Sequence, residues 1–251
     1  MAEHAGWPAL PLAHWESTRD TVQLWTQIVG KVRLALEPAA NHWWNVSLYV
    51  NAVGLTTSLM PHRGLGVEMT FDVVGHQLLI RTTDGRERRV ALQPRTVTDF
   101  YAEFRARLAE LDLDVPINPK PVEVVESIPF ADDVEHASYD PDAMHRFWTS
   151  LVSSQRVFSR FRGEFRGKAS PVHFFRGAFD LAVTRFSGRP HHIQAVSQLP
   201  RLGDARGLLR RGLQLWLLAR RRRRRGLLLL RLPRAGRVPR PGGRTTRGPL
   251  R

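Results

Sequence analysis

Two short aromatic segments that each begin with a histidine are the first places where chemistry can be expected. They are His42-Trp43-Trp44 and His173-Phe174-Phe175. If both lie on one surface, they set two imidazoles beside aromatic faces, which suits a flat or cationic ligand or a general base. The alternative is a pair of core strands whose histidines are hydrogen-bonded and inert, and the sequence leaves both readings open.

A second candidate is the segment Glu135–Asp140, which collects a carboxylate, the His136 imidazole, a hydroxyl and the Tyr139 phenol within six residues. Loops carried on a rigid scaffold often hold functional groups. The competing interpretation is a turn followed by a helix, with Asp140 as the N-cap and His136 as a packing residue.

Asp180 and Arg185 lie among aromatic residues in the long apolar stretch that follows His173. They are five positions apart, so a regular strand points them to opposite faces and a direct pair is not expected. One of the two is expected to line the pocket. Together the candidate pocket residues are His42, Trp43, Trp44, His136, Tyr139, His173, Asp180 and Arg185.

Metal and cofactor motifs are not found. The chain has no cysteine, and the adjacent pair His191-His192 lacks the spacing that a helix would need to hold a metal. No phosphate-binding loop, dinucleotide fingerprint or nucleophile elbow is present, so no metal site is predicted and any cofactor stays unknown.

The elements that must position these residues predict an α+β fold with a mainly antiparallel sheet and about three helices. Apolar residues at helical spacing indicate helices near residues 18–36, after Thr96 and after Asp140-Pro141. Alternating patterns and the Asp84-Gly85 turn signal predict a strand meander over residues 66–92. Residues 170–190 are predicted to form one long strand.

The two aromatic segments also predict a repeat of a helix followed by a strand. A helix containing Trp25 precedes the first segment, and a helix containing Trp148 precedes the second. The apolar runs that follow, residues 46–55 and 177–186, are both expected to be strands.

The net charge of +15 belongs to the last part of the chain. Residues 201–251 contain 17 Arg and one acid, whereas residues 1–200 hold 21 basic and 22 acidic side chains. The body therefore has no field that would attract a polyanion. We divide the chain into an α+β domain, residues 1–198, and a tail, residues 199–251.

The tail is composed mainly of Arg, Leu, Gly and Pro, and is predicted to be disordered or an isolated helix. GC-rich DNA read in the wrong frame gives the same composition. With GC-rich codons, skipping one nucleotide converts residues 216–221 to Gly-Phe-Trp-Pro-Gly, and two other tail segments become ordinary protein sequence. The sequence thus predicts that the tail is an out-of-frame translation.

The body resembles a bacterial domain-of-unknown-function family, the one numbered 5996, over about residues 6–190. The residues that carry the resemblance include Trp7–Leu12, Leu24–Lys31, Asn41–Trp44, Glu135–Asp140 and Ser170–Phe175. The resemblance implies that the tail departs from the family at about Leu199. It implies no activity.

Three functions remain open on the sequence. The first is a small-molecule-binding or enzymatic domain with an aromatic and histidine pocket, and the second is nucleic-acid or anionic-surface binding through Arg220, Arg221, Arg222, Arg223, Arg224 and Arg225. The third is a structural or interaction protein without catalysis. No secretory signal or membrane span is visible, so a cytoplasmic protein is expected.

Overall fold

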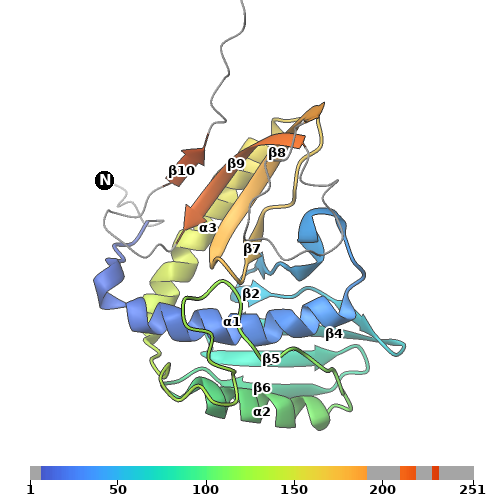
Figure 1. Ribbon diagram of the computed structural model, residues 1–251, viewed down its shortest axis with the longest axis vertical. Coiled ribbons are helices and arrows are strands. Elements are labelled where there is room, and N and C mark those ends of the chain that lie inside the picture. Colours follow the sequence, from blue (N-terminus) through green and yellow to red (C-terminus); the bar gives the residue numbers. More distant parts are fainter. Residues whose placement is uncertain (1–6, 191–209, 219–227, 232–251) are drawn as a thin grey trace, which may run out of the picture.

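The computed structural model describes residues 7–190, 210–218 and 228–231. Within this part of the chain three helices longer than one or two turns and two antiparallel sheets form the α+β fold that the sequence predicted (Figure 1). The helices are α1 (Glu16–Leu36), α2 (Val97–Ala109) and α3 (Pro141–Gly163), with the short 3₁₀ segments η1 (Leu12–His14) and η2 (Asn41–Val46).

The larger sheet has six strands in the order β1-β2-β4-β5-β6, with β3 paired to β4. Its central strands form the predicted meander, and Gly85 takes a positive φ of 89° in the predicted Asp84-Gly85 turn. The strands are β1 (Tyr49–Val50), β2 (Gly54–Thr56), β3 (Met60–His62), β4 (Leu65–Asp72), β5 (Gln77–Thr82) and β6 (Glu87–Ala91).

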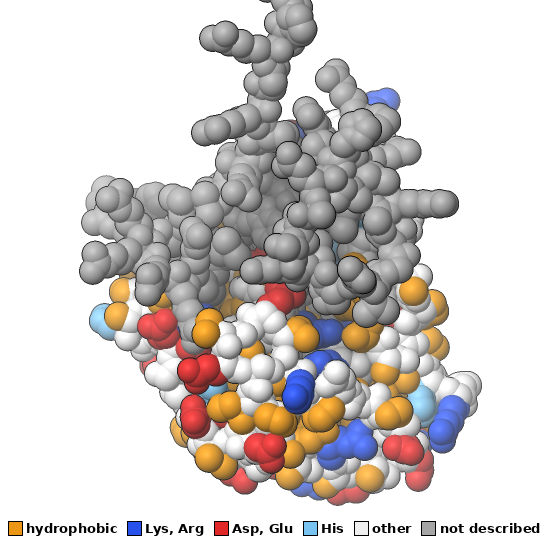
Figure 2. All heavy atoms as spheres, in the orientation of Figure 1, with side chains coloured by type: hydrophobic (Ala, Val, Ile, Leu, Met, Phe, Trp, Pro, Cys, Tyr) orange, Lys and Arg blue, Asp and Glu red, His pale blue; other side chains and the backbone are white. Residues whose placement is uncertain are grey.

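The second sheet has the order β10-β9-β8-β7, and its strands are β7 (His173–Phe175), β8 (Asp180–Pro190), β9 (Arg210–Leu218) and β10 (Leu228–Arg231). It meets the larger sheet where Leu48 and Phe174 exchange backbone hydrogen bonds of 2.8 and 2.7 Å. On the described part of the face in Figure 2, side chains of both charge signs lie among scattered hydrophobic ones.

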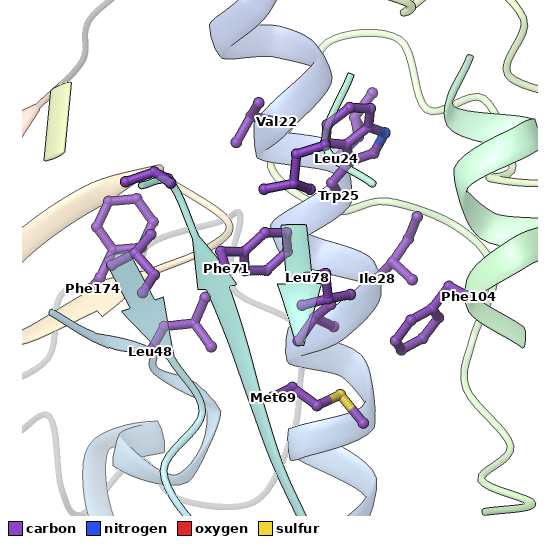
Figure 3. Packing of buried hydrophobic residues seen from close by; sticks show 14 of the residues in the cluster. Val22, Leu24, Trp25, Ile28, Leu48, Met69, Phe71, Leu78, Phe104 and Phe174 are labelled. Atoms are coloured by element: carbon purple, nitrogen blue, oxygen red, sulfur yellow. The ribbon is translucent and has the colours of Figure 1, made fainter. Parts of the chain in front are cut away.

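Helix α1 is central to the core and crosses the molecule in front of the large sheet (Figure 1). It is buried on nearly every side between Thr18 and Arg33, unlike a surface helix with one apolar stripe. Trp25 of α1 stacks on Phe100 of α2, with ring centroids 4.6 Å apart. Figure 3 shows Trp25 and Ile28 pointing to the side of α1 where Phe104 of α2 lies, with Phe71 and Leu78 of the large sheet beside the helix in the same cluster.

The first half of the predicted repeat, the helix containing Trp25 followed by a strand over residues 46–55, differs in the structure after the helix. His42 and Trp43 both adopt the left-handed conformation, with φ of 59°, and belong to η2. The following apolar run forms the β1–β2 hairpin in place of one strand, because the Asn51 side chain accepts hydrogen bonds from the backbone N–H groups of Val53 and Gly54 and stabilises a turn.

The single long strand predicted over residues 170–190 is wrong. Phe179 adopts the left-handed conformation, with φ of 55°, and the chain reverses between β7 and β8 to form an antiparallel hairpin. Within the hairpin the side chains still alternate between the two faces. Asp180 pairs with Phe175 and Ala182 pairs with His173, so these four residues share one face of the β7–β8 hairpin. Phe174 lies on the opposite face, where Phe147 of α3 contacts it at a centroid distance of 6.2 Å. Helix α3 therefore covers one face of the hairpin, and the other face carries Asp180 and His173.

Two tail segments differ from the predicted coil or isolated helix. Residues 210–218 form β9, which pairs antiparallel with β8, and residues 228–231 form β10, which pairs with β9. Leu213, Leu215 and Leu217 recur at every second position of β9, which is the period of a strand and not of a helix. The remaining tail residues, including Arg220–Arg225, lie outside the described residues.

Candidate functional site

The two aromatic segments meet on the face of the β7–β8 hairpin that α3 does not cover. The His42 ring lies 5.2 Å from Trp44 and 4.6 Å from Phe186 of β8. The Trp44 ring in turn lies 6.5 Å from that of His173, in an edge-on arrangement. The structure thus brings His42, Trp44 and His173 into one aromatic cluster, which we call the η2–β8 cluster together with Phe186.

A cation of the protein already occupies the outer side of this cluster. The Lys168 ammonium lies 5.0 Å from the Phe186 ring centroid and 5.7 Å from that of Trp44. Its Nζ also lies 2.8 Å from His42 Nε2, and an ammonium can only donate, so His42 accepts this hydrogen bond through Nε2. Lys168 therefore takes the position that a cationic ligand would need.

His173 is buried and held in one tautomer. Ser47 Oγ donates to the Trp44 carbonyl oxygen at 2.9 Å and lies 3.2 Å from His173 Nδ1. Because a hydroxyl has one proton, His173 Nδ1 must donate to Ser47, which leaves Nε2 as a hydrogen-bond acceptor. Burial lowers the pKa of His173 to about 4, so its imidazole is neutral at physiological pH.

Asp180 is the most unusual residue on this face. It is fully buried, and neither carboxylate oxygen has a hydrogen-bond partner among the residues that the structure describes. Burial, and after it the negative charge of Glu123, raises the pKa of Asp180 to about 7, against a weaker opposing effect of its own backbone N–H. Asp180 and His173 occupy diagonal positions on one face, where residues lie roughly 7–8 Å apart.

Arg185 points away from this site, as the parity of the strand predicts. Its guanidinium lies 3.7 Å from the centroid of Phe161 in α3 and 5.4 Å from that of Phe165. Glu164 is 3.8 Å from it. Arg185 therefore connects β8 to α3 and to the residues that follow α3 through its contacts with Phe161, Glu164 and Phe165. Trp43 is 45% exposed, and no ring contact of this indole is found within the described residues.

His136 and Tyr139 lie in a different part of the molecule, beside α1 and α2. The buried Asp133 carboxylate accepts from His136 Nδ1 at 2.9 and 3.0 Å, and also from the backbone N–H groups of Glu135 and His136. The Tyr139 hydroxyl lies 3.0 Å from His76 Nδ1. This arrangement fits the packing interpretation.

The helix cap predicted for this segment is confirmed, because Asp140 Oδ1 accepts from the Ala143 N–H at 3.1 Å and Pro141 opens α3. The candidate residues therefore separate into three places. His42, Trp43 and Trp44 belong to η2, and His173 and Asp180 to the hairpin face opposite α3. His136 and Tyr139 belong to the loop, and Arg185 belongs to the hairpin face that α3 covers.

A group of charged residues beside the β7–β8 turn was missed by the sequence analysis. Burial lowers the pKa of Arg176 to about 10, and the buried Lys31 of α1 lies close enough for Arg176 to lower its pKa as well. Glu123, from the loop before α3, lies over Gly177 of the turn. These residues are far apart in sequence, and only Gly30 inside an otherwise regular helix hinted that something packs closely there.

Among the described residues, no three His, Cys, Asp or Glu side chains are grouped so that they could hold a metal ion. In the same part of the chain, no helix combines the length and the apolar character that a membrane crossing requires.

These features define an α+β domain with a buried histidine and a buried carboxyl group on the face of a hairpin opposite α3. The chain belongs to a family of unknown function, DUF5996, whose model matches residues 7–206. The match ends within the segment where the composition of the chain changes. No curated protein and no solved structure matches the chain.

Proposed function

We propose that the domain binds a small molecule on the face of the β7–β8 hairpin opposite α3, between Asp180 and the η2–β8 cluster. The observation that carries this proposal is the Asp180 carboxyl group, which is fully buried and has no hydrogen-bond partner among the described residues. Burying a polar group without a partner costs about 1–3 kcal/mol, so such groups are few in native proteins. A ligand that hydrogen-bonds to Asp180 would offset this cost.

The side chains that face this site favour a flat, uncharged ligand. At and below neutral pH the Asp180 carboxyl group can donate a hydrogen bond, while His173 Nε2 can accept one. Trp44 offers a ring face beside them, and Lys168 already makes the cation–π contacts that a cationic ligand would otherwise make. The ligand expected here has a ring and carries both a donor and an acceptor.

An enzymatic role is a second candidate, favoured by the opposite shifts of the two pKa values. Asp180, with a pKa of about 7, can hold a proton at physiological pH, and His173, with a pKa of about 4, remains an unprotonated base. Two titratable groups with such different environments are the usual arrangement of an acid and a base in catalysis. Proton transfer to and from the bound molecule is the reaction class that this pair supports.

The experiment is a thermal-unfolding screen of the full chain at pH 6.5 against uncharged heteroaromatic compounds. A compound that raises the midpoint should bind about tenfold more weakly to Asp180→Asn and to His173→Gln, because each substitution alters one buried hydrogen bond. Asp142→Asn and His145→Gln are matched controls at exposed positions of α3. A ligand whose effect is the same in all four variants would contradict the site.

The alternative of nucleic-acid or anionic-surface binding depends on Arg220–Arg225. It rests on the charge of the tail, since residues 1–200 are nearly balanced in charge. Sequencing the gene across the codons for residues 194–209 decides it. One surplus nucleotide would remove the arginine run from the natural protein, and an intact frame would call for a salt-dependent binding assay with and without residues 201–251.

A purely structural or interaction protein is the remaining alternative, and a broad screen in which no compound shifts the unfolding midpoint would favour it. The cytoplasmic location expected from the sequence is part of the present proposal. It is tested by fractionating cells that express the chain.

A further inference from the structure

A polar stripe runs along the side of α1 that faces the β7–β8 turn. Gln23, Gln27 and Lys31 recur at intervals of four residues and so lie above one another on the helix. Gln23 Nε2 donates to the carbonyl oxygen of Gly177 in the turn. Gln27 both donates to the Val122 carbonyl and accepts from the Val122 N–H, each at 2.8 Å. The two glutamines therefore fix the turn and the loop before α3 against the helix.

Arg176 lies directly across α1 at Gly30. A Cβ atom at Gly30 would lie 1.7 Å from Arg176 Cδ and 2.2 Å from its Nε, so any larger residue there would displace the Arg176 side chain. Glycine inside a helix costs about 0.5–1 kcal/mol relative to alanine, and the close approach of Arg176 is the gain that accompanies this cost. Arg176 is only 6% exposed, and its Nε is buried without a hydrogen-bond acceptor among the described residues.

Lys31, the last residue of the polar stripe on α1, is a second buried cation beside Arg176. It is buried, and its Nζ lies 5.9 Å from the ring centroid of Phe130. Burial first, and then the charge of Arg176, lowers the pKa of Lys31 to about 8. Two buried cations thus lie beside one another.

A carboxylate in direct contact with this pair is not supplied by the described residues. No ion pair within 4.0 Å joins Lys31 or Arg176 to a carboxylate in the part of the chain that the structure describes. The negative charge of Glu123 raises the pKa of Arg176. However, the exposed Glu123 side chain lies over Gly177, where its Oε1 would be 2.4 Å from a Cβ atom built on Gly177. Uncompensated buried charges are costly, and a bound anion would offset that cost.

We propose that Lys31 and Arg176 form a binding site for a small anion of carboxylate or phosphate chemistry, held between α1 and the β7–β8 turn. Guanidinium groups bind both anions through two parallel hydrogen bonds, and an ammonium adds a point charge. The anion site uses neither Asp180 nor His173, so it can be tested independently of the small-molecule site proposed above.

The first test compares inorganic phosphate, acetate and chloride at equal ionic strength in thermal unfolding of the full chain. We expect phosphate or acetate to raise the midpoint by roughly 5 °C more than chloride. The more effective of the two anions identifies the chemistry of the natural group. Arg176→Gln and Lys31→Met should abolish the difference between anions, and Arg176→Lys should keep part of it.

Loss of folding can be separated from loss of binding. Lys31→Met removes an unpaired buried cation and keeps most of the side-chain volume, so this variant should unfold at or above the wild-type midpoint in chloride. Equal midpoints of the wild-type chain in all three anions would overturn the proposal.

The second test uses pyridoxal 5′-phosphate, which carries an aldehyde and a phosphate, followed by borohydride reduction and peptide mapping. The chain has three lysines, Lys31, Lys120 and Lys168, so labelling can be assigned residue by residue. An amine with a lowered pKa beside an anion site should form the imine preferentially. We expect Lys31 to be labelled at a concentration about tenfold lower than the other two lysines.

Arg176→Gln should reduce labelling of Lys31 about tenfold and leave Lys120 and Lys168 unchanged, because only Lys31 lies beside Arg176. Inorganic phosphate should protect Lys31 selectively. Labelling confined to Lys120 and Lys168, or labelling of Lys31 that does not depend on Arg176, would overturn the proposal.

Discussion

The loop before α3 and the β7–β8 hairpin contain the same residue types and use them differently. In the loop, Asp133 accepts hydrogen bonds from His136 Nδ1 and from two backbone N–H groups. In the hairpin, Asp180 is as deeply buried, and neither of its carboxylate oxygens has a partner among the described residues. The loop carboxylate is satisfied locally, whereas the strand carboxylate is left without a partner.

The difference follows from backbone geometry. A turn directs its own N–H groups inward, so an aspartate can accept from residues two and three positions further on. In a strand the N–H groups point sideways to neighbouring strands, and Asp180 is paired on both sides, with Phe175 and with Leu218. A buried aspartate in a central strand must therefore find its partner elsewhere, which makes it the better candidate for function.

The largest effect is expected for Asp180→Asn. The pKa of Asp180 is raised from 3.8 to about 7, so the folded state binds more protons than the unfolded state and wild-type stability falls as pH rises through this range. The variant lacks this loss and should gain up to about 4 kcal/mol over wild type at pH 8.5, and little at pH 4. Urea unfolding between pH 4 and 9 measures it, with Asp142→Asn as the exposed control.

If the free energy of unfolding that Asp180→Asn gains over wild type did not vary with pH, Asp180 would be ionised and stabilised in the folded protein. That result would remove the contrast between the two aspartates.

His173→Gln should show the opposite dependence on pH. The folded state keeps His173 neutral down to a pKa of about 4, whereas the unfolded state takes up a proton near 6.5, so wild-type stability falls as pH decreases between these values. This loss amounts to about 3 kcal/mol and should be absent in the variant. The same urea series checks it with His145→Gln as control, and identical pH profiles of variant and wild type would contradict the buried neutral histidine.

Asp133→Ala tests the other side of the comparison. It leaves the N–H groups of Glu135 and His136 without their acceptor and should lower the free energy of unfolding by about 2 kcal/mol at neutral pH. Ligand binding on the hairpin face should not change. Asp132→Ala, at the exposed neighbouring position, should unfold like wild type, and an equal effect of the two substitutions would contradict a specific role for Asp133.

The smallest effect is expected at the start of α3. Asp140→Ala removes the side chain that caps the Ala143 N–H and should destabilise the domain by about 1 kcal/mol. Asp140→Ser should recover most of this loss, since a hydroxyl can also cap the helix. If serine and alanine variants had the same unfolding midpoint, the cap would not be the reason for the loss.

Local signals in the sequence predicted much of the fold. The Asp140-Pro141 helix start, the Asp84-Gly85 turn and the opposite faces of Asp180 and Arg185 all depend on neighbours within a few residues, and the structure agrees with each. The left-handed conformation of two consecutive residues, His42 and Trp43, has no such signal, because positive φ is uncommon for residues other than glycine and a bulky residue such as tryptophan rarely adopts it. This conformation gives η2 immediately before the apolar run, and the run itself forms the β1–β2 hairpin in place of the predicted strand.

The candidate site was predicted less completely, because its contacts are non-local. His173 and the Trp44 region meet through the pairing of Leu48 with Phe174, which no pattern within either segment specifies. Arg176 and Lys31 are equally distant in sequence. Tertiary packing, and not local periodicity, places both sets of residues together.

The most direct test of the central contrast is a carbon-13 NMR titration of the aspartate carboxyl groups, with Asp180→Asn and Asp133→Ala used to assign the two resonances. The account predicts that Asp180 titrates near pH 7 and that an added ligand which contacts it shifts that midpoint. An Asp180 carboxyl group that titrates at the ordinary value of 3.8 would contradict a buried carboxyl group without a partner, and with it the proposed site.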